Sequence, residues 1–126
     1  MTDKHVLFVG FDPARMNLDE APVGTAAQIQ DGIDRSMQAL EAAGYIATFC
    51  PLAEEGEDAE QIVRAQLQTR SFDCVVIGAG VRLLVKHTAL FEALVNAVVE
   101  AAPGAKLAFN ATPGDAADAV DRQLRG

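Results

Sequence analysis

Residues 72–82 read FDCVVIGAGVR, an apolar run that ends in two glycines and an arginine. The four residues from Cys74 to Ile77 show no alternation of polar and apolar side chains. Strands of this kind are covered on both faces and occur almost only in parallel sheets clothed by helices. The stretch therefore predicts a central strand, followed by a turn in which Gly78 and Gly80 permit positive φ angles or a close backbone approach.

Length and composition indicate a single α/β domain over residues 1–126, because 126 residues is an ordinary domain size and no shift in composition divides the chain. The formal net charge of −8 argues against nucleic acids and anionic membranes as partners. The first apolar run, Val6 to Phe11, is too short for a signal peptide or a membrane span, so we expect a cytoplasmic protein. Cys50 and Cys74 are too few for a disulfide framework or a zinc site, and we expect buried thiols.

Strands and helices are expected to alternate along the chain. The expected strands are His5–Gly10, Tyr45–Cys50 with Pro51 closing it at a sheet edge, Cys74–Ile77 and Lys106–Phe109. The expected helices are Thr25–Ala43, Ala59–Thr69, Thr88–Ala101 and a last one that starts with Thr112 as N-cap and Pro113 as first residue and runs to Leu124. Residues 83–87 are expected to form a short basic loop.

This alternation predicts a four-stranded parallel doubly wound sheet with helices on both faces. The first and third strands are the most apolar and belong in the middle, which gives the strand order 2-1-3-4. Ligands bind to such sheets beyond the carboxyl ends of the two strands at the switch point, here strands one and three. The loop from Phe11 to Gly24 is unusually long for a connection between a strand and a helix, and it borders that crevice.

The residues expected around the crevice share a polar or glycine character and follow strands one, three and four. They are Asp12, Arg15, Gly78, Gly80, Arg82, His87, Asn110 and Thr112, with Lys86 close by. A guanidinium group on a glycine turn can clamp a carboxylate or a phosphate, which makes Arg82 the main candidate ligand residue. The alternative is that Arg82 pairs with Asp12 and ties the two loops together.

His87 has two interpretations, a general base or a helix cap or surface residue, and the second is the commoner role for a histidine just before a helix. No spacing of nucleophile and base, or of metal ligands, is present in the sequence, so we expect no metal. Residues 76–80 resemble the start of the Rossmann dinucleotide fingerprint, but Leu83 stands where the third glycine is needed. An acidic ribose-binding residue is also missing after the next strand, so we expect no dinucleotide cofactor.

In its order of strands and helices, nearly the whole chain resembles flavodoxins and response-regulator receiver domains, and it resembles small bacterial α/β proteins of this length. The motifs of these families are not intact. Asp12 alone could match the acidic pair of a receiver, Gly78–Gly80 stands where a receiver has its aspartate, and a fifth strand is missing. The segment Gly10–Arg15 replaces the Ser/Thr-rich phosphate loop of a flavodoxin, and the chain has one Tyr and no Trp for a flavin sandwich.

Two functions remain as hypotheses, because fold resemblance alone does not establish function. The first is binding of a small anionic molecule, a phosphate or a carboxylate, at the carboxyl ends of strands one and three. The second is a receiver-like protein-interaction module without phosphorylation chemistry. A homodimer would then form through the helix 88–101, whose apolar stripe is wide, or through the strand 106–109 at the sheet edge.

Overall fold

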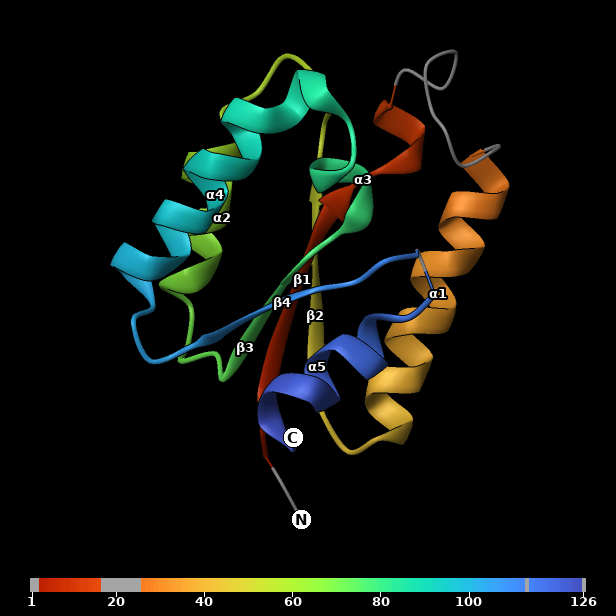
Figure 1. Cartoon of the computed structure of the whole chain (residues 1–126), viewed down its shortest axis with the longest axis vertical. Coiled ribbons are helices and arrows are strands. Elements are labelled where there is room, and N and C mark those ends of the chain that lie inside the picture. Colours follow the sequence, from red (N-terminus) through yellow and green to blue (C-terminus); the bar gives the residue numbers. More distant parts are fainter. Residues whose placement is uncertain (1–2, 17–25, 113, 126) are drawn as a thin grey trace.

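The structure, a computed structural model, describes residues 3–16, 26–112 and 114–125. The described residues form a four-stranded, all-parallel sheet with the strand order β2-β1-β3-β4 (Figure 1). The strands are β1 (His5–Phe11), β2 (Ile46–Leu52), β3 (Cys74–Ile77) and β4 (Lys106–Phe109). The predicted fold class and strand order are confirmed, with β1 and β3 paired side by side in the middle.

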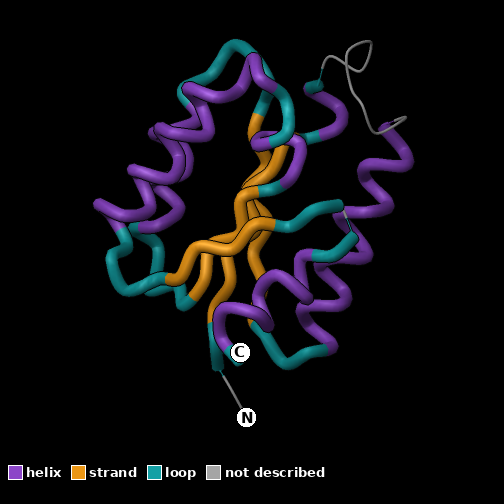
Figure 2. Tube along the Cα trace, viewed as in Figure 1, coloured by secondary structure: helices purple, strands orange, loops and turns teal. Residues whose placement is uncertain are grey.

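Helices cover both faces of this sheet (Figure 2). The helices α2 (Ala59–Leu67) and α4 (Thr88–Ala101) lie on one face, and α1 (Ala26–Ala42) and α5 (Ala116–Leu124) lie on the other. Alternate residues of β1 serve the two layers, since Leu7 and Val9 belong to the core beneath α2 and α4 whereas Val6 and Phe8 belong to the core beneath α1 and α5. All four residues of β3 are buried, which is the reason that its sequence shows no polar alternation.

The second strand extends past the residue that was expected to end it. β2 continues through Pro51 to Leu52, with Pro51 opposite Gly10 in the parallel register with β1. Proline is tolerated there because β2 is an edge strand, and a missing N–H at a free edge breaks no ladder bond. The edge position is confirmed, and the predicted strand end was wrong.

The connection after β3 is helical, although a loop was predicted over residues 83–87. One turn of helix, α3 (Ala79–Arg82), follows Gly78 directly, and a 3-10 helix (Val85–His87) precedes α4. The turn needs no positive φ: Gly78 has a φ of −63°, and the described residues with positive φ are Gly44 and Gly56. Gly78 instead serves close approach, since a Cβ atom there would lie 3.1 Å from the backbone oxygen of Val9.

The last helix starts later than predicted. α5 begins at Ala116 with Asp115 before it, and the Asp115 carboxylate accepts hydrogen bonds from the backbone N–H groups of Ala111 and Thr112. Thr112 is therefore not the N-cap, because the aspartate three residues on organises this turn. Pro113, Gly24 and Thr25, for which helix starts or loop ends were predicted, lie outside the described residues.

The described residues contain no helix with the length and apolar character needed to cross a lipid bilayer.

Candidate functional site

A cavity lies at the carboxyl ends of β1 and β3, at the position that the strand order predicts. The chain leaves β1 toward α1 on one face and leaves β3 toward α4 on the other, so the two connections part there (Figure 1). The volume open to the centres of water molecules is about 70 Å³. One water needs roughly 10–15 Å³, so the space holds several waters, and it is about half of the roughly 150 Å³ of a cavity that encloses benzene.

Apolar side chains form most of the cavity lining. The rings of Phe8, Phe11 and Phe49 come from β1 and β2, and Ile29 and Ile33 come from the buried face of α1. The rings of Phe8 and Phe49 meet edge to face, with their centroids 5.6 Å apart. Phe8 and Phe49 share one wall because the even residues of β1 and the odd residues of β2 face the layer of α1 and α5, whereas Phe11 belongs to the core beneath α2 and α4.

Backbone forms another part of the lining. Gly10, Gly78 and Gly80 all border the cavity, and none of them carries a side chain that would fill it. A Cβ atom at Gly10 would lie 3.5 Å from the ring of Phe49, and one at Gly80 would lie 3.9 Å from the ring of Phe11. Gly10 near the end of β1, Gly78 after β3 and Gly80 in α3 therefore leave the space beside these aromatic rings open.

Asn110, the first residue after β4, is a buried polar residue that borders this cavity. The residue as a whole is 1% exposed. Its Nδ2 donates to the backbone oxygen of Thr112 at 2.7 Å, which identifies the other terminal atom as the Oδ1 acceptor. That Oδ1 atom is buried and has no hydrogen-bond partner in the part of the chain that the structure describes. An unpaired buried acceptor is uncommon in proteins and calls for an explanation.

Arg82 lies next to Asn110 but is not part of the cavity lining. Its Nη2 donates to the backbone oxygen of Asn110 at 2.8 Å, and its guanidinium carbon lies 5.9 Å from the ring centroid of Phe109. The alternative that Arg82 pairs with Asp12 was wrong, because the two residues have different partners. The Nε of Arg82 is buried and has no partner among the described residues.

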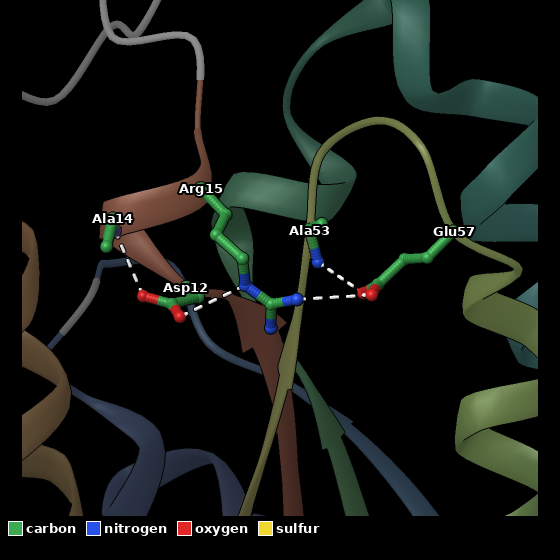
Figure 3. A network of polar contacts seen from close by, with 5 residues as sticks. All are labelled: Asp12, Ala14, Arg15, Ala53 and Glu57. Atoms are coloured by element: carbon green, nitrogen blue, oxygen red, sulfur yellow. Dashed lines mark hydrogen bonds and ion pairs between the residues drawn. The ribbon is translucent and has the colours of Figure 1, made fainter.

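Asp12 and Arg15 belong to a separate polar network beyond the end of β1 (Figure 3). The Asp12 carboxylate caps the 3-10 helix Pro13–Arg15 by accepting from the N–H of Ala14 at 3.0 Å, and it pairs with Arg15 at 3.2 Å. Arg15 also pairs with Glu57 at 3.1 Å, and Glu57 accepts from the backbone N–H of Ala53. The network fastens the β1 end to the connection between β2 and α2, and both cation and anions are satisfied within it.

A second network contains a residue that sequence reasoning missed. The side chain of Glu54 is 4% exposed, and its Oε2 lies 3.0 Å from both Lys86 Nζ and His87 Nε2. His87 stands at the N-cap position of α4, but its side chain makes no capping hydrogen bond. The residue is buried and its ring packs on Phe11 with centroids 4.9 Å apart, so the interpretation as a surface residue was wrong. Glu54 stands in an acidic run whose residues resemble a solvated turn, and no local pattern distinguishes it from Glu55.

The predicted site residues thus divide into three groups. Gly78, Gly80 and Asn110 line the cavity, while Thr112 holds the Asn110 amide and borders a shallower polar depression next to α1 and α5. Arg82 supports Asn110 from outside. The other predicted residues, Asp12, Arg15 and His87, hold loops together through contacts between a carboxylate and a basic side chain.

The described residues that line this cavity include no cysteine and no group of metal ligands. Cys50 and Cys74 are free and buried in β2 and β3, as predicted. Burial raises the pKa of Cys50 to about 11 and that of Cys74 to about 12, so both remain protonated thiols. Within residues 3–16, 26–112 and 114–125, no group of three or more histidine, cysteine, aspartate and glutamate side chains could hold a metal ion.

Compared with models of known protein families the chain matches none, and no curated protein matches it.

Proposed function

We propose that the chain binds a small molecule with an apolar body in the cavity at the carboxyl ends of β1 and β3. The observation that carries this proposal is a cavity with an open volume of about 70 Å³ that aromatic, aliphatic and glycine residues line at the carboxyl ends of the two central strands. Ligand sites are commonly concave and mostly apolar, with few polar groups that fix orientation. The position at the topological switch point is the one at which α/β sheets bind ligands.

The test is ligand-observed NMR with a panel of neutral one-ring and two-ring compounds, using wild-type protein and two leucine variants. Gly80→Leu places a side chain at the cavity lining, from a position that is itself exposed. Gly104→Leu is the matched control, because Gly104 lies before β4 at the opposite end of the sheet and a Cβ atom there meets nothing within 4 Å. We expect binding to wild type and Gly104→Leu and loss of binding in Gly80→Leu. Equal binding by both variants contradicts the proposal.

A small anionic ligand, a phosphate or carboxylate as the sequence led us to expect, is a second candidate. It is supported by the Arg82 guanidinium, whose Nε is buried without a partner among the described residues. Against it, Arg15, Lys86 and His87 already face carboxylates. Benzoate is a suitable probe: binding that is lost in Arg82→Gln and kept in Arg122→Gln would favour the anionic ligand. Arg122 is the matched control because it too donates to a nearby backbone oxygen, that of Phe109 at 2.9 Å.

The hypothesis of a protein-interaction module is proposed here as self-association. The homodimer would form through residues 88–101 or 106–109. It is supported by Val99 on α4, which is 55% exposed, and by the edge position of β4. Light scattering coupled to size-exclusion chromatography tests it. Val99→Ser should lower the dimer fraction, whereas Val85→Ser, which changes a valine that is 89% exposed outside both segments, should not. A wild-type protein that stays monomeric at high concentration removes this candidate.

A cytoplasmic location also remains a proposal. It is supported by the two free cysteines, since thiols stay reduced in that compartment.

A further inference from the structure

The edge strand β4 turns a row of backbone groups away from the sheet. β4 is the last strand in the order, and among the described strands its neighbour is β3 alone (Figure 1). The N–H of Lys106 donates to the Asp73 oxygen at 3.0 Å, so Lys106 faces β3. Backbone groups of successive strand residues point to opposite sides, so Leu107 and Phe109 face the free edge. The carbonyl of Ala105 faces it too, because a trans peptide sets that carbonyl opposite the Lys106 N–H.

Two of these outward groups are already bonded within the chain. The N–H of Ala105 donates to the Ala102 oxygen at 3.0 Å. The carbonyl of Phe109 accepts from Nη2 of Arg122 at 2.9 Å. Four outward groups then have no partner within the described residues, and they are the carbonyl of Ala105, the N–H and carbonyl of Leu107, and the N–H of Phe109. The free part of the edge is therefore short and has a defined start and end.

The four free groups form a self-complementary set. Along the strand they read acceptor, donor, acceptor, donor, and a second copy that runs antiparallel presents them in the reverse order. With a twofold axis through Leu107, the two Leu107 residues exchange both of their hydrogen bonds, and each Phe109 N–H meets the Ala105 carbonyl of the other copy. In a longer ladder the Ala105 N–H would pair with the Phe109 carbonyl, and these are the two groups already bonded within the chain. A strand of another protein would instead leave an N–H and a carbonyl of its own unpaired at these positions.

Apolar side chains of α4 flank the same edge. Phe91, Val95 and Val99 follow one another every four residues, so they lie along one side of the helix. That side adjoins β4, because the ring of Phe91 meets the ring of Phe109 edge to face with centroids 5.6 Å apart. Val99 is 55% exposed and lies nearer the start of β4, since α4 leads back to that end. The twofold axis thus brings the Val99 end of one α4 toward the Phe91 end of the other and removes apolar surface from water.

The opposite edge of the sheet is less suited to pairing. The N–H of Ile46 donates to the Lys4 oxygen at 2.9 Å, so alternate residues from Ala47 onward face the free edge of β2. Pro51 is one of these residues and has no N–H to offer. Proline is a common means of preventing strand addition at an edge. The comparison favours β4 as the edge that pairs.

We infer that two copies of the chain join β4 to β4 in antiparallel orientation, with Leu107 on the twofold axis, so that their two sheets become one. This inference rests on the self-association proposed above and names the strand and the register through which it occurs. The paired stretch is short, and small interfaces give weak complexes, so the dimer fraction should rise with protein concentration.

The first test removes the outward N–H at the axis. Leu107→Pro lacks this donor and leaves the hydrogen bonds between β3 and β4 in place, whereas Ala47→Pro makes the same change at the free edge of β2. Light scattering coupled to size-exclusion chromatography, over a series of concentrations, gives the dissociation constant of each dimer. We expect Leu107→Pro to raise it at least about tenfold, since two hydrogen bonds per dimer are lost. Ala47→Pro should leave it unchanged, and circular dichroism shows that each variant is folded.

The second test checks the register by oxidation of single introduced cysteines. Directly opposite residues of a hydrogen-bonded antiparallel pair have Cα atoms roughly 5.5 Å apart, within the roughly 4.4–6.8 Å that a disulfide spans. Leu107→Cys should therefore form a disulfide-linked dimer faster than Lys106→Cys. Lys106 is the more exposed of the two residues, so random collision would favour the opposite result. The buried Cys50 and Cys74 are present in both variants and contribute equally.

The outcomes separate this inference from self-association in general. Dimer loss confined to Leu107→Pro, with faster cross-linking of Leu107→Cys, supports both. A dimer that persists in folded Leu107→Pro, equal loss in both proline variants, or equal cross-linking at the two positions overturns the β4 pairing, and self-association through α4 then stands. A wild-type protein that stays monomeric at high concentration overturns both and leaves the edge to a strand of another protein. If Leu107→Pro does not fold, the cross-linking rates decide.

Discussion

Replacing Gly78 by alanine tests the claim that two central strand ends approach each other too closely for a side chain. The added Cβ would lie 3.1 Å from the Val9 backbone oxygen, 3.5 Å from the Phe8 ring and 3.6 Å from the Cα of Gly10. The closest of these atoms belongs to the backbone of β1, which is held between two neighbouring strands and cannot easily move away. Because the φ of Gly78 is −63°, alanine suffers no backbone strain there, and the penalty is steric alone.

The magnitude follows from two opposing effects. Overpacking of a well-packed site costs about 1–3 kcal/mol. Restricting the unfolded chain by a glycine-to-alanine change returns about 0.4–1 kcal/mol. Gly78→Ala should therefore lower the free energy of unfolding by about 0.5–2 kcal/mol.

Two other glycines provide controls for this prediction. At Gly104 a Cβ atom meets nothing within 4 Å, so Gly104→Ala should raise the free energy of unfolding by about 0.4–1 kcal/mol. At Gly56 there is also nothing within 4 Å, but its φ is +87°, so alanine should destabilise through backbone strain of about 1–2 kcal/mol before the entropic gain.

Urea titrations followed by far-ultraviolet circular dichroism measure all three free energies. The reasoning is refuted if Gly78→Ala is as stable as Gly104→Ala. In that case the ends of β1 and β3 can move apart without a loss of stability, and the close approach of Gly78 to Val9 does not require glycine.

Glu54→Gln removes a buried carboxylate, whose Oε2 lies 3.0 Å from His87 Nε2. We expect the free energy of unfolding to fall by about 1–3 kcal/mol in the same urea titrations. A variant as stable as wild type would mean that this carboxylate does not link the two segments. Burial, followed by hydrogen bonding to an aspartate, raises the pKa of Tyr45 from 10.0 to about 12. The folded state therefore retains this proton where the unfolded state loses it, so the contribution to stability is complete below pH 10.0 and is lost as the pH rises toward about 12. Because Tyr45 is the sole tyrosine and there is no tryptophan, tyrosinate absorbance reports it directly, and titration near 10.0 in folded protein would contradict the prediction. Cys50 and Cys74, whose pKa values burial raises to about 11 and about 12, should resist alkylation in the folded state and react in urea; modification of either thiol at equal rates in both conditions would show that the core opens readily.

The sequence alone determined the layered architecture of this protein. The unbroken apolar run at residues 74–77 results from burial of that strand on both faces, and the apolar stripes of the helices result from burial on one face. Both patterns can therefore be recognised in a short stretch of sequence. The strand order followed from those patterns and from the handedness of parallel crossovers, and with it followed the end of the sheet at which the cavity lies.

The roles of individual residues at that end depended on the tertiary structure. Glu54 and His87 lie 33 positions apart, and only folding brings their side chains within 3.0 Å and makes a buried pair of two residues that look solvated in sequence. Arg82 was expected to clamp an anion, and only the structure shows that its Nη2 donates to the backbone oxygen of Asn110.

The same distinction holds for Asn110, which was predicted near the crevice on the basis of its place after the last strand. That its oxygen is buried and has no partner among the described residues, whereas its nitrogen donates to the Thr112 oxygen, follows from the path of the backbone two residues later. Local patterns report which faces of the chain avoid water. Which atom of a polar side chain lacks a partner depends on contacts between distant segments, and these are specified by the whole fold.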